Sequence, residues 1–102
     1  MIAELEDHRP ELEELCRRHH VARLELFGSA AAGHARRSRT DLDFLVEFGP
    51  LLGSGYADSY FGLLEALEHL LGQPVDLVVA TAIHNPYFRQ SVEQTKSLIY
   101  EA

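Results

Sequence analysis

Residues 41–48, Asp-Leu-Asp-Phe-Leu-Val-Glu-Phe, limit the possible folds most, because polar and apolar side chains largely alternate there. Alternation with a period of two predicts a β-strand that buries one face. The side chains expected to face the core are Leu42, Phe44, Val46 and Phe48. Asp41 and Asp43 would project together from the opposite face, since residues two apart in a strand point the same way. A fold that contains this strand must place two neighbouring carboxylates on one side of a sheet.

Neighbouring carboxylates repel each other unless a positive charge lies between them. A divalent cation is the usual solution, and Mg²⁺ is the cation expected where oxygen ligands face phosphates. Asp41 and Asp43 are therefore candidate ligands of Mg²⁺. The alternative is a solvated strand edge on which both aspartates are ordinary surface acids.

A Gly-Ser turn precedes this strand and favours the metal interpretation. The alternation at residues 21–27 predicts a first strand with Leu24 and Leu26 facing inward, and Gly28 ends it. Three alanines at 30–32 predict a short helix, which places Ser29 near its N-cap, where backbone N–H groups attract anions. Gly28 would let the backbone approach a phosphate, and the Ser29 hydroxyl could bond one of its oxygens. Both residues are candidate nucleotide-binding residues, although a Gly-Ser pair alone also occurs in many ordinary turns.

Composition narrows the class of protein. The length of 102 residues fits a single domain spanning residues 1–102. A formal net charge of −7 argues against direct nucleic-acid binding, which needs basic groups that neutralise phosphates. The single cysteine, Cys16, excludes an intramolecular disulfide and is expected to be a core residue. We expect neither a membrane span nor a signal peptide, and hence a cytoplasmic protein.

The order of predicted elements indicates an α+β fold, a small mixed β-sheet flanked by helices. Helices are expected at residues 2–20, just after Ser29, from Asp58 or Ser59 to Leu71, and from Pro86, capped by Asn85, to about Thr95. Pro10 interrupts the pattern of the first helix, and the alternative is a helix that starts only there, with Pro10 in its first turn. Strands are expected at residues 21–27, 41–48, 74–79 and 97–101. In the last strand, Leu98 and Tyr100 are expected on one face and Ile99 on the other.

A third carboxylate, Asp76, interrupts the apolar run at residues 75–79. Burying it would be costly unless it pairs with a cation or binds a metal. If the strands form one sheet, Asp41, Asp43 and Asp76 can converge on Mg²⁺ that faces phosphates held at the Gly28-Ser29 turn. This constellation suits nucleotidyl transfer, with Asp76 also able to take the proton from an attacking hydroxyl. A simple ion pair at Asp76 is the alternative.

The run Phe27-Gly28-Ser29, then Gly33, Asp41-x-Asp43 and Asp76, resembles the minimal nucleotidyltransferases of the DNA polymerase β-like superfamily. The resemblance covers most of the chain and implies that superfamily's fold. Small proteins of this kind resemble the antitoxin of prokaryotic toxin–antitoxin pairs whose toxin is a HEPN-type RNase. The resemblance implies a Mg²⁺-dependent enzyme that transfers AMP from ATP to a tyrosine of the toxin, and hence a hetero-oligomer.

Two positions depart from the family pattern. Ala32 replaces the arginine that often precedes the second glycine, and Thr40 replaces the usual serine before the first aspartate. The basic loop at residues 34–40 could supply the missing positive charge, or it could simply be solvated. A degenerate antitoxin that neutralises its toxin by binding alone is therefore the main alternative. Transfer to a small molecule is disfavoured, because 102 residues leave no room for an acceptor domain.

Overall fold

The computed structural model describes residues 3–28, 42–50 and 55–102. The helices are α1 (Ala3–Glu6), α2 (Arg9–Arg18), α3 (Tyr56–Leu71), α4 (Pro86–Thr95) and a single 3-10 turn, η1 (Ala80–Ala82). The strands are β1 (Val21–Phe27), β2 (Leu42–Phe48), β3 (Val75–Val79) and β4 (Ser97–Glu101). The short helix expected after Ser29 lies outside the described residues.

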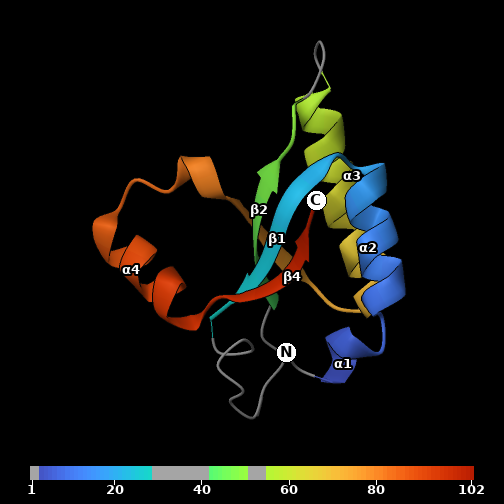
Figure 1. Ribbon diagram of the computed structural model, residues 1–102, viewed down its shortest axis with the longest axis horizontal. Coiled ribbons are helices and arrows are strands. Elements are labelled where there is room, and N and C mark those ends of the chain that lie inside the picture. Colours follow the sequence, from blue (N-terminus) through green and yellow to red (C-terminus); the bar gives the residue numbers. More distant parts are fainter. Residues whose placement is uncertain (1–2, 29–41, 51–54) are drawn as a thin grey trace.

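The four strands form one mixed sheet in the order β3-β2-β1-β4. Strand β1 is antiparallel to β2 and β4, whereas β2 and β3 are parallel and are joined through α3. Helices α2 and α3 cover one face of the sheet, and α4 lies on the other side (Figure 1). The α+β architecture expected from the sequence is confirmed.

The two faces of the sheet carry separate apolar clusters. The larger cluster joins the sheet to α2 and α3, and it buries Leu42, Phe44 and Val46 completely, as the alternation of β2 predicts. Phe48 packs against its rim. A smaller cluster under α4 consists of Phe27, Leu45, Ile83 and Val92. The second face is thus only partly covered, which leaves room for polar side chains beside α4.

Several helix boundaries differ from the expected ones for local reasons. The helix expected over residues 2–20 is interrupted between α1 and α2. Pro10 lies in the first turn of α2, where its missing N–H costs nothing, as the alternative start predicted. Helix α3 begins at Tyr56 after Gly55, before the expected caps. It ends where Gly72 adopts the left-handed conformation, with a φ of 69°. No described helix has the length and apolar character needed to cross a bilayer.

The C-terminal elements combine one confirmed prediction with one error. The Asn85 side chain accepts hydrogen bonds from the N–H groups of Tyr87 and Phe88, at 2.9 and 3.2 Å, and so caps α4 as expected. The side-chain directions predicted for β4 are wrong, because the register of its pairing with β1 shifts by one residue. Tyr100 pairs with Leu24, but the next residue of β1, Glu25, pairs with Leu98. Ile99 is left buried in the larger cluster, and Tyr100 packs against that same cluster.

Cys16 has no exposed surface, and burial raises the pKa of its thiol to about 12. The thiol therefore stays protonated in the folded chain at mildly alkaline pH, and a protonated thiol is a poor nucleophile. We expect an aromatic disulfide reagent to leave Cys16 unmodified in the native protein and to modify it fully in denaturant, as followed by absorbance. Rapid modification without denaturant would contradict the buried placement.

Candidate active site

Asp43 and Asp76 lie side by side. Asp43 of β2 and Asp76 of β3 occupy paired positions in the parallel ladder. Paired residues of neighbouring strands point to the same face, and the strands run about 4.8 Å apart. Asp43 is half-buried and Asp76 is exposed. The structure therefore brings together two of the three carboxylates that the sequence singles out.

Gly28 completes the described part of the site from the other side of β2. Phe27 pairs with Asp43, and Gly28 follows it with a φ of 80°, which side-chain-bearing residues rarely adopt. A Cβ atom at Gly28 would lie only 2.7 Å from Oδ2 of Asp43. The glycine is required here both by its backbone conformation and by its close approach to the carboxylate.

The amide of Gly28 has a partner within the protein. Its N–H donates a hydrogen bond of 3.0 Å to Oγ1 of Thr95, at the end of α4. The glycine thus brings the chain close to Asp43 while its own amide is held by α4. Thr95 was missed by the sequence reasoning, because no local motif marks a helix-terminal threonine as the partner of a turn 67 residues away.

The other predicted site residues fall outside the described part of the chain. Ser29, Asp41 and the basic loop at 34–40 belong to residues 29–41. Within the ranges that the structure describes, no group of three His, Cys, Asp or Glu side chains is placed to hold a metal. The described residues Asp43 and Asp76 supply two of the hard oxygen ligands that suit Mg²⁺. The donor chemistry of the pair therefore fits the predicted metal.

The negative charge of Asp76 also affects the pKa of a tyrosine on α3, Tyr60. Burial raises the pKa of Tyr60, and the carboxylate of Asp76 raises it further, followed by Tyr56. The Tyr60 hydroxyl donates a hydrogen bond of 2.6 Å to the carbonyl oxygen of Leu77. This phenol stays neutral and helps to hold β3, the strand that carries Asp76, against α3.

A buried ion pair lies on the same face of the sheet. Glu25 is only 5% exposed, and its carboxylate lies 3.7 Å from Nζ of Lys96 and 3.3 Å from Nε of Arg23. Arg23 Nε approaches without the geometry of a hydrogen bond. These cations compensate the buried charge, so Glu25 joins β1 to the end of α4 and is not a candidate metal ligand.

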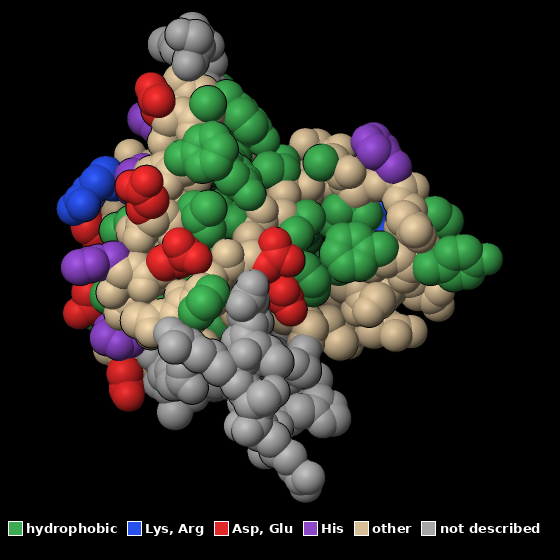
Figure 2. Space-filling model, turned by 180° about the vertical axis from the view of Figure 1, so that it is seen from behind, with side chains coloured by type: hydrophobic (Ala, Val, Ile, Leu, Met, Phe, Trp, Pro, Cys, Tyr) green, Lys and Arg blue, Asp and Glu red, His purple; other side chains and the backbone are tan. Residues whose placement is uncertain are grey.

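An apolar surface adjoins the acidic pair. The ring of Phe88 on α4 meets Phe27 edge-to-face, with ring centroids 5.8 Å apart, and Tyr87 beside it is 81% exposed. Figure 2 views the molecule from behind and shows acidic side chains near its centre with hydrophobic side chains over the neighbouring elements. Among the described residues, apolar side chains of α4 therefore lie on the same side of the sheet as the two carboxylates.

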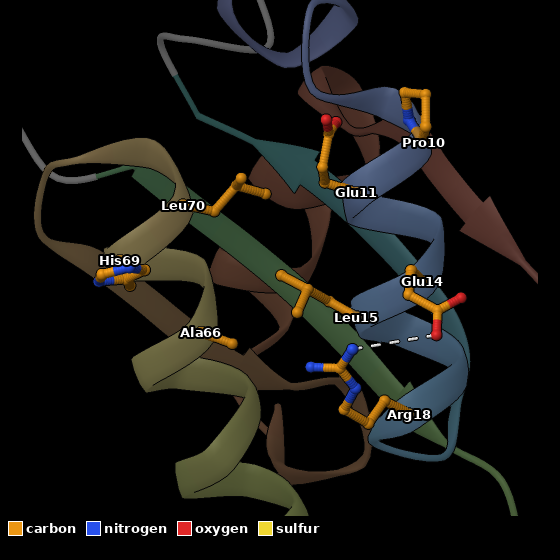
Figure 3. A pocket seen from close by; sticks show the side chains of 8 residues that line it. All are labelled: Pro10, Glu11, Glu14, Leu15, Arg18, Ala66, His69 and Leu70. Carbon is orange, nitrogen blue, oxygen red and sulfur yellow. Dashed lines mark ion pairs between the residues drawn. The ribbon is translucent and has the colours of Figure 1, made fainter.

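A pocket lies between α2 and α3, away from the carboxylates of Asp43 and Asp76. It encloses about 500 Å³ on the helical side of the sheet, with Glu14 and Arg18 forming an ion pair of 4.0 Å at its wall (Figure 3). Its lining residues are Pro10, Glu11, Glu14, Leu15, Arg18, Ala66, His69 and Leu70. Asp43 projects from the opposite face of the sheet, so this pocket does not form part of the acidic site.

Two relatives resemble the chain in sequence and match most of its length. "Putative protein adenylyltransferase MJ1379" of Methanocaldococcus jannaschii is 37% identical over 98 residues, which cover 88% of this chain and 94% of that protein. A solved structure described as "Structure of putative minimal nucleotidyltransferase" superposes with a TM-score of 0.73 at 35% identity, covering 91% of this chain and 90% of the other.

More distant structures share the fold. A toxin–antitoxin complex with AMP-PNP matches with a TM-score of 0.67 at 22% identity, over 92% of this chain and 73% of the other. A complex of the tri-AMPylated Shewanella oneidensis HEPN toxin with its MNT antitoxin matches with a TM-score of 0.64 at 19% identity, over 96% and 73%. Residues 11–99 match the family described as the nucleotidyltransferase domain. With its paired carboxylates, its glycine turn and these matches, the chain belongs to the nucleotidyltransferase domain family.

Proposed function

We propose that this protein is an antitoxin that transfers AMP from ATP to a tyrosine of a cognate HEPN-type toxin and thereby inactivates it. The observation that carries the proposal is the pairing of Asp43 with Asp76 on parallel strands, directly beside the turn at Gly28. The ladder fixes the backbone positions of both carboxylates without a ligand, and such preorganisation is what electrostatic catalysis requires.

The proposed roles follow from chemistry and position. Asp41, Asp43 and Asp76 hold Mg²⁺, and Gly28 and Ser29 bind the nucleotide together with the first two aspartates. When bound, Mg²⁺ neutralises the triphosphate and polarises its phosphoryl oxygens. Asp43 is half-buried between β1 and β3, which suits a ligand whose position must not vary, whereas Asp76 is exposed toward an incoming acceptor.

The proposed reaction is a displacement at the α-phosphorus of ATP. The oxygen of the acceptor tyrosine forms a bond to this phosphorus as the bond to the bridging oxygen of the β-phosphate breaks. Pyrophosphate leaves with the electron pair of that bond, and AMP remains on the tyrosine. The phenolic proton passes to the carboxylate of Asp76, which is exposed and so accessible to the acceptor.

The relatives support the acceptor class in the proposal. The Methanocaldococcus jannaschii relative is named as a protein adenylyltransferase. Two structural neighbours are toxin–antitoxin complexes, one with AMP-PNP and one with an AMPylated HEPN toxin. We extend these properties to this chain, as a single cytoplasmic domain over residues 1–102 that forms a hetero-oligomer with its toxin and needs no direct nucleic-acid contact.

The test is to incubate the full chain with its HEPN-type partner, ATP and Mg²⁺, and to weigh the partner by mass spectrometry. We expect the partner to gain the mass of one or more adenylyl groups, and chelation of the metal to prevent the gain. A partner whose mass is unchanged while its RNase activity is still blocked would overturn the proposal. That result would favour neutralisation by binding alone, the alternative to which Ala32 points.

A further inference from the structure

We infer that Thr95 is a positioning residue for the nucleotide-binding turn, and that it acts through Gly28 on the carboxylate of Asp43. The inference deepens the proposed function and rests on it, because it concerns the same turn. Thr95 is the last residue of α4, and it touches neither carboxylate in any contact that the structure assigns to it.

The hydroxyl of Thr95 is held in one orientation by two hydrogen bonds. It donates to the carbonyl oxygen of Ser91, one turn earlier in α4, at 3.1 Å. It accepts from the N–H of Gly28 at 3.0 Å. Because the donated proton is committed to Ser91, the lone pairs of the oxygen are directed toward Gly28.

The helix end that carries Thr95 is itself fixed against β1. Val92 is buried in the cluster that contains Phe27, the residue before Gly28. Lys96, directly after Thr95, pairs with the buried Glu25 of β1. Packing and charge therefore hold α4 on both sides of the hydroxyl, so the bond to Gly28 connects the turn to a rigid element.

A small movement of Gly28 would be felt at Asp43. The position that a Cβ of Gly28 would occupy lies 2.7 Å from Oδ2 of Asp43, so the side of Gly28 where a side chain would stand faces this carboxylate at close range. The left-handed φ of 80° gives the turn few alternative conformations that keep this contact. Thr95 therefore fixes the distance between the phosphate-binding turn and a proposed metal ligand.

Three variants of the full chain test the inference. Thr95→Val keeps the shape of the side chain but removes the acceptor, and Thr95→Ser keeps the acceptor. Thr81→Val is the matched control, because Thr81 is an exposed threonine in η1, which contacts β2 and follows the end of β3 opposite Asp76. Circular dichroism melts check that each variant folds.

Two readouts separate positioning from general destabilisation. The first is hydrogen exchange of the Gly28 amide by NMR, and the second is the dissociation constant for ATP with Mg²⁺ together with KM and kcat for adenylyl transfer. We expect Thr95→Val to speed exchange at Gly28 and to weaken ATP binding about tenfold, the effect of losing one hydrogen bond. Thr95→Ser and Thr81→Val should match the wild type in both.

The possible outcomes distinguish this inference from the proposed function. Unchanged ATP affinity and unchanged KM and kcat in Thr95→Val would overturn the inference while the function stands. Weakened ATP binding in Thr95→Val, in a wild-type chain that binds ATP but transfers no AMP, would support the inference and overturn the function. A wild-type chain that binds no ATP would overturn both.

Discussion

Asp43→Asn is expected to lower the rate of adenylyl transfer about 10³-fold, since a lost metal ligand removes several kcal/mol of transition-state stabilisation. The amide has the same shape as the carboxylate but is neutral and a poorer ligand for Mg²⁺. It also removes repulsion from the paired carboxylate of Asp76, so the free energy of unfolding should change by about 1 kcal/mol or less. The measurements are partner adenylylation followed by mass and a denaturant melt.

Glu47→Gln provides the matched control for this variant. Glu47 lies on the same strand and, four residues on, on the same face, but it is exposed and pairs with Arg23 of β1 at the far end of the ladder. The same loss of one negative charge there should leave the rate unchanged. Full activity of Asp43→Asn, or equal loss in both variants, would show that Asp43 is not a metal ligand.

Gly28→Ala is expected to lower the transfer rate about 10²-fold, the effect of displacing a catalytic group by about 1 Å. The new methyl group would lie against Oδ2 of Asp43 and push the carboxylate aside. The left-handed backbone should also cost about 1–2 kcal/mol of stability. Initial rates at saturating ATP and a thermal melt measure the two effects separately.

Gly72→Ala separates these two causes. Gly72 has a similar φ of 69°, but nothing lies within 4 Å of the position where its Cβ would be. Its substitution should reproduce the stability loss and leave the transfer rate intact. If both variants lose stability and rate to the same extent, backbone strain explains the result and contact with Asp43 does not.

The sequence predicts the acidic pair because each of its strands carries a local signal. Alternation assigned Leu42 and Phe44 to the core, which puts Asp43 on the opposite face. Asp76 stood out as a charge within an apolar run. Their exact pairing depends on the crossover through α3, and the register of a parallel ladder is set by tertiary packing that no short pattern encodes.

Features that depend on distant partners could not be predicted. The bond from Gly28 to Thr95 spans 67 residues and links a turn to a helix end. The shift in β4 depends on how Ile99 fits against β1, since simple alternation would have placed Leu98 and Tyr100 together. Helix α3 begins at Tyr56 with no capping side-chain hydrogen bond, so neither expected cap, Asp58 or Ser59, marks its start.

The position of β1 at the centre of the sheet has a consequence for synthesis on the ribosome. Although β1 is the first strand made, its two neighbours are β2 and β4, and β4 is the last strand of the fold. Asp76 must also wait for α3 to be translated before it can join Asp43. The partners of this early strand thus arrive one after another, so a nascent chain stalled before β4 has the edge of β1 from Arg23 to Leu26 unpaired. The four-stranded sheet is therefore completed only when its last strand has been made.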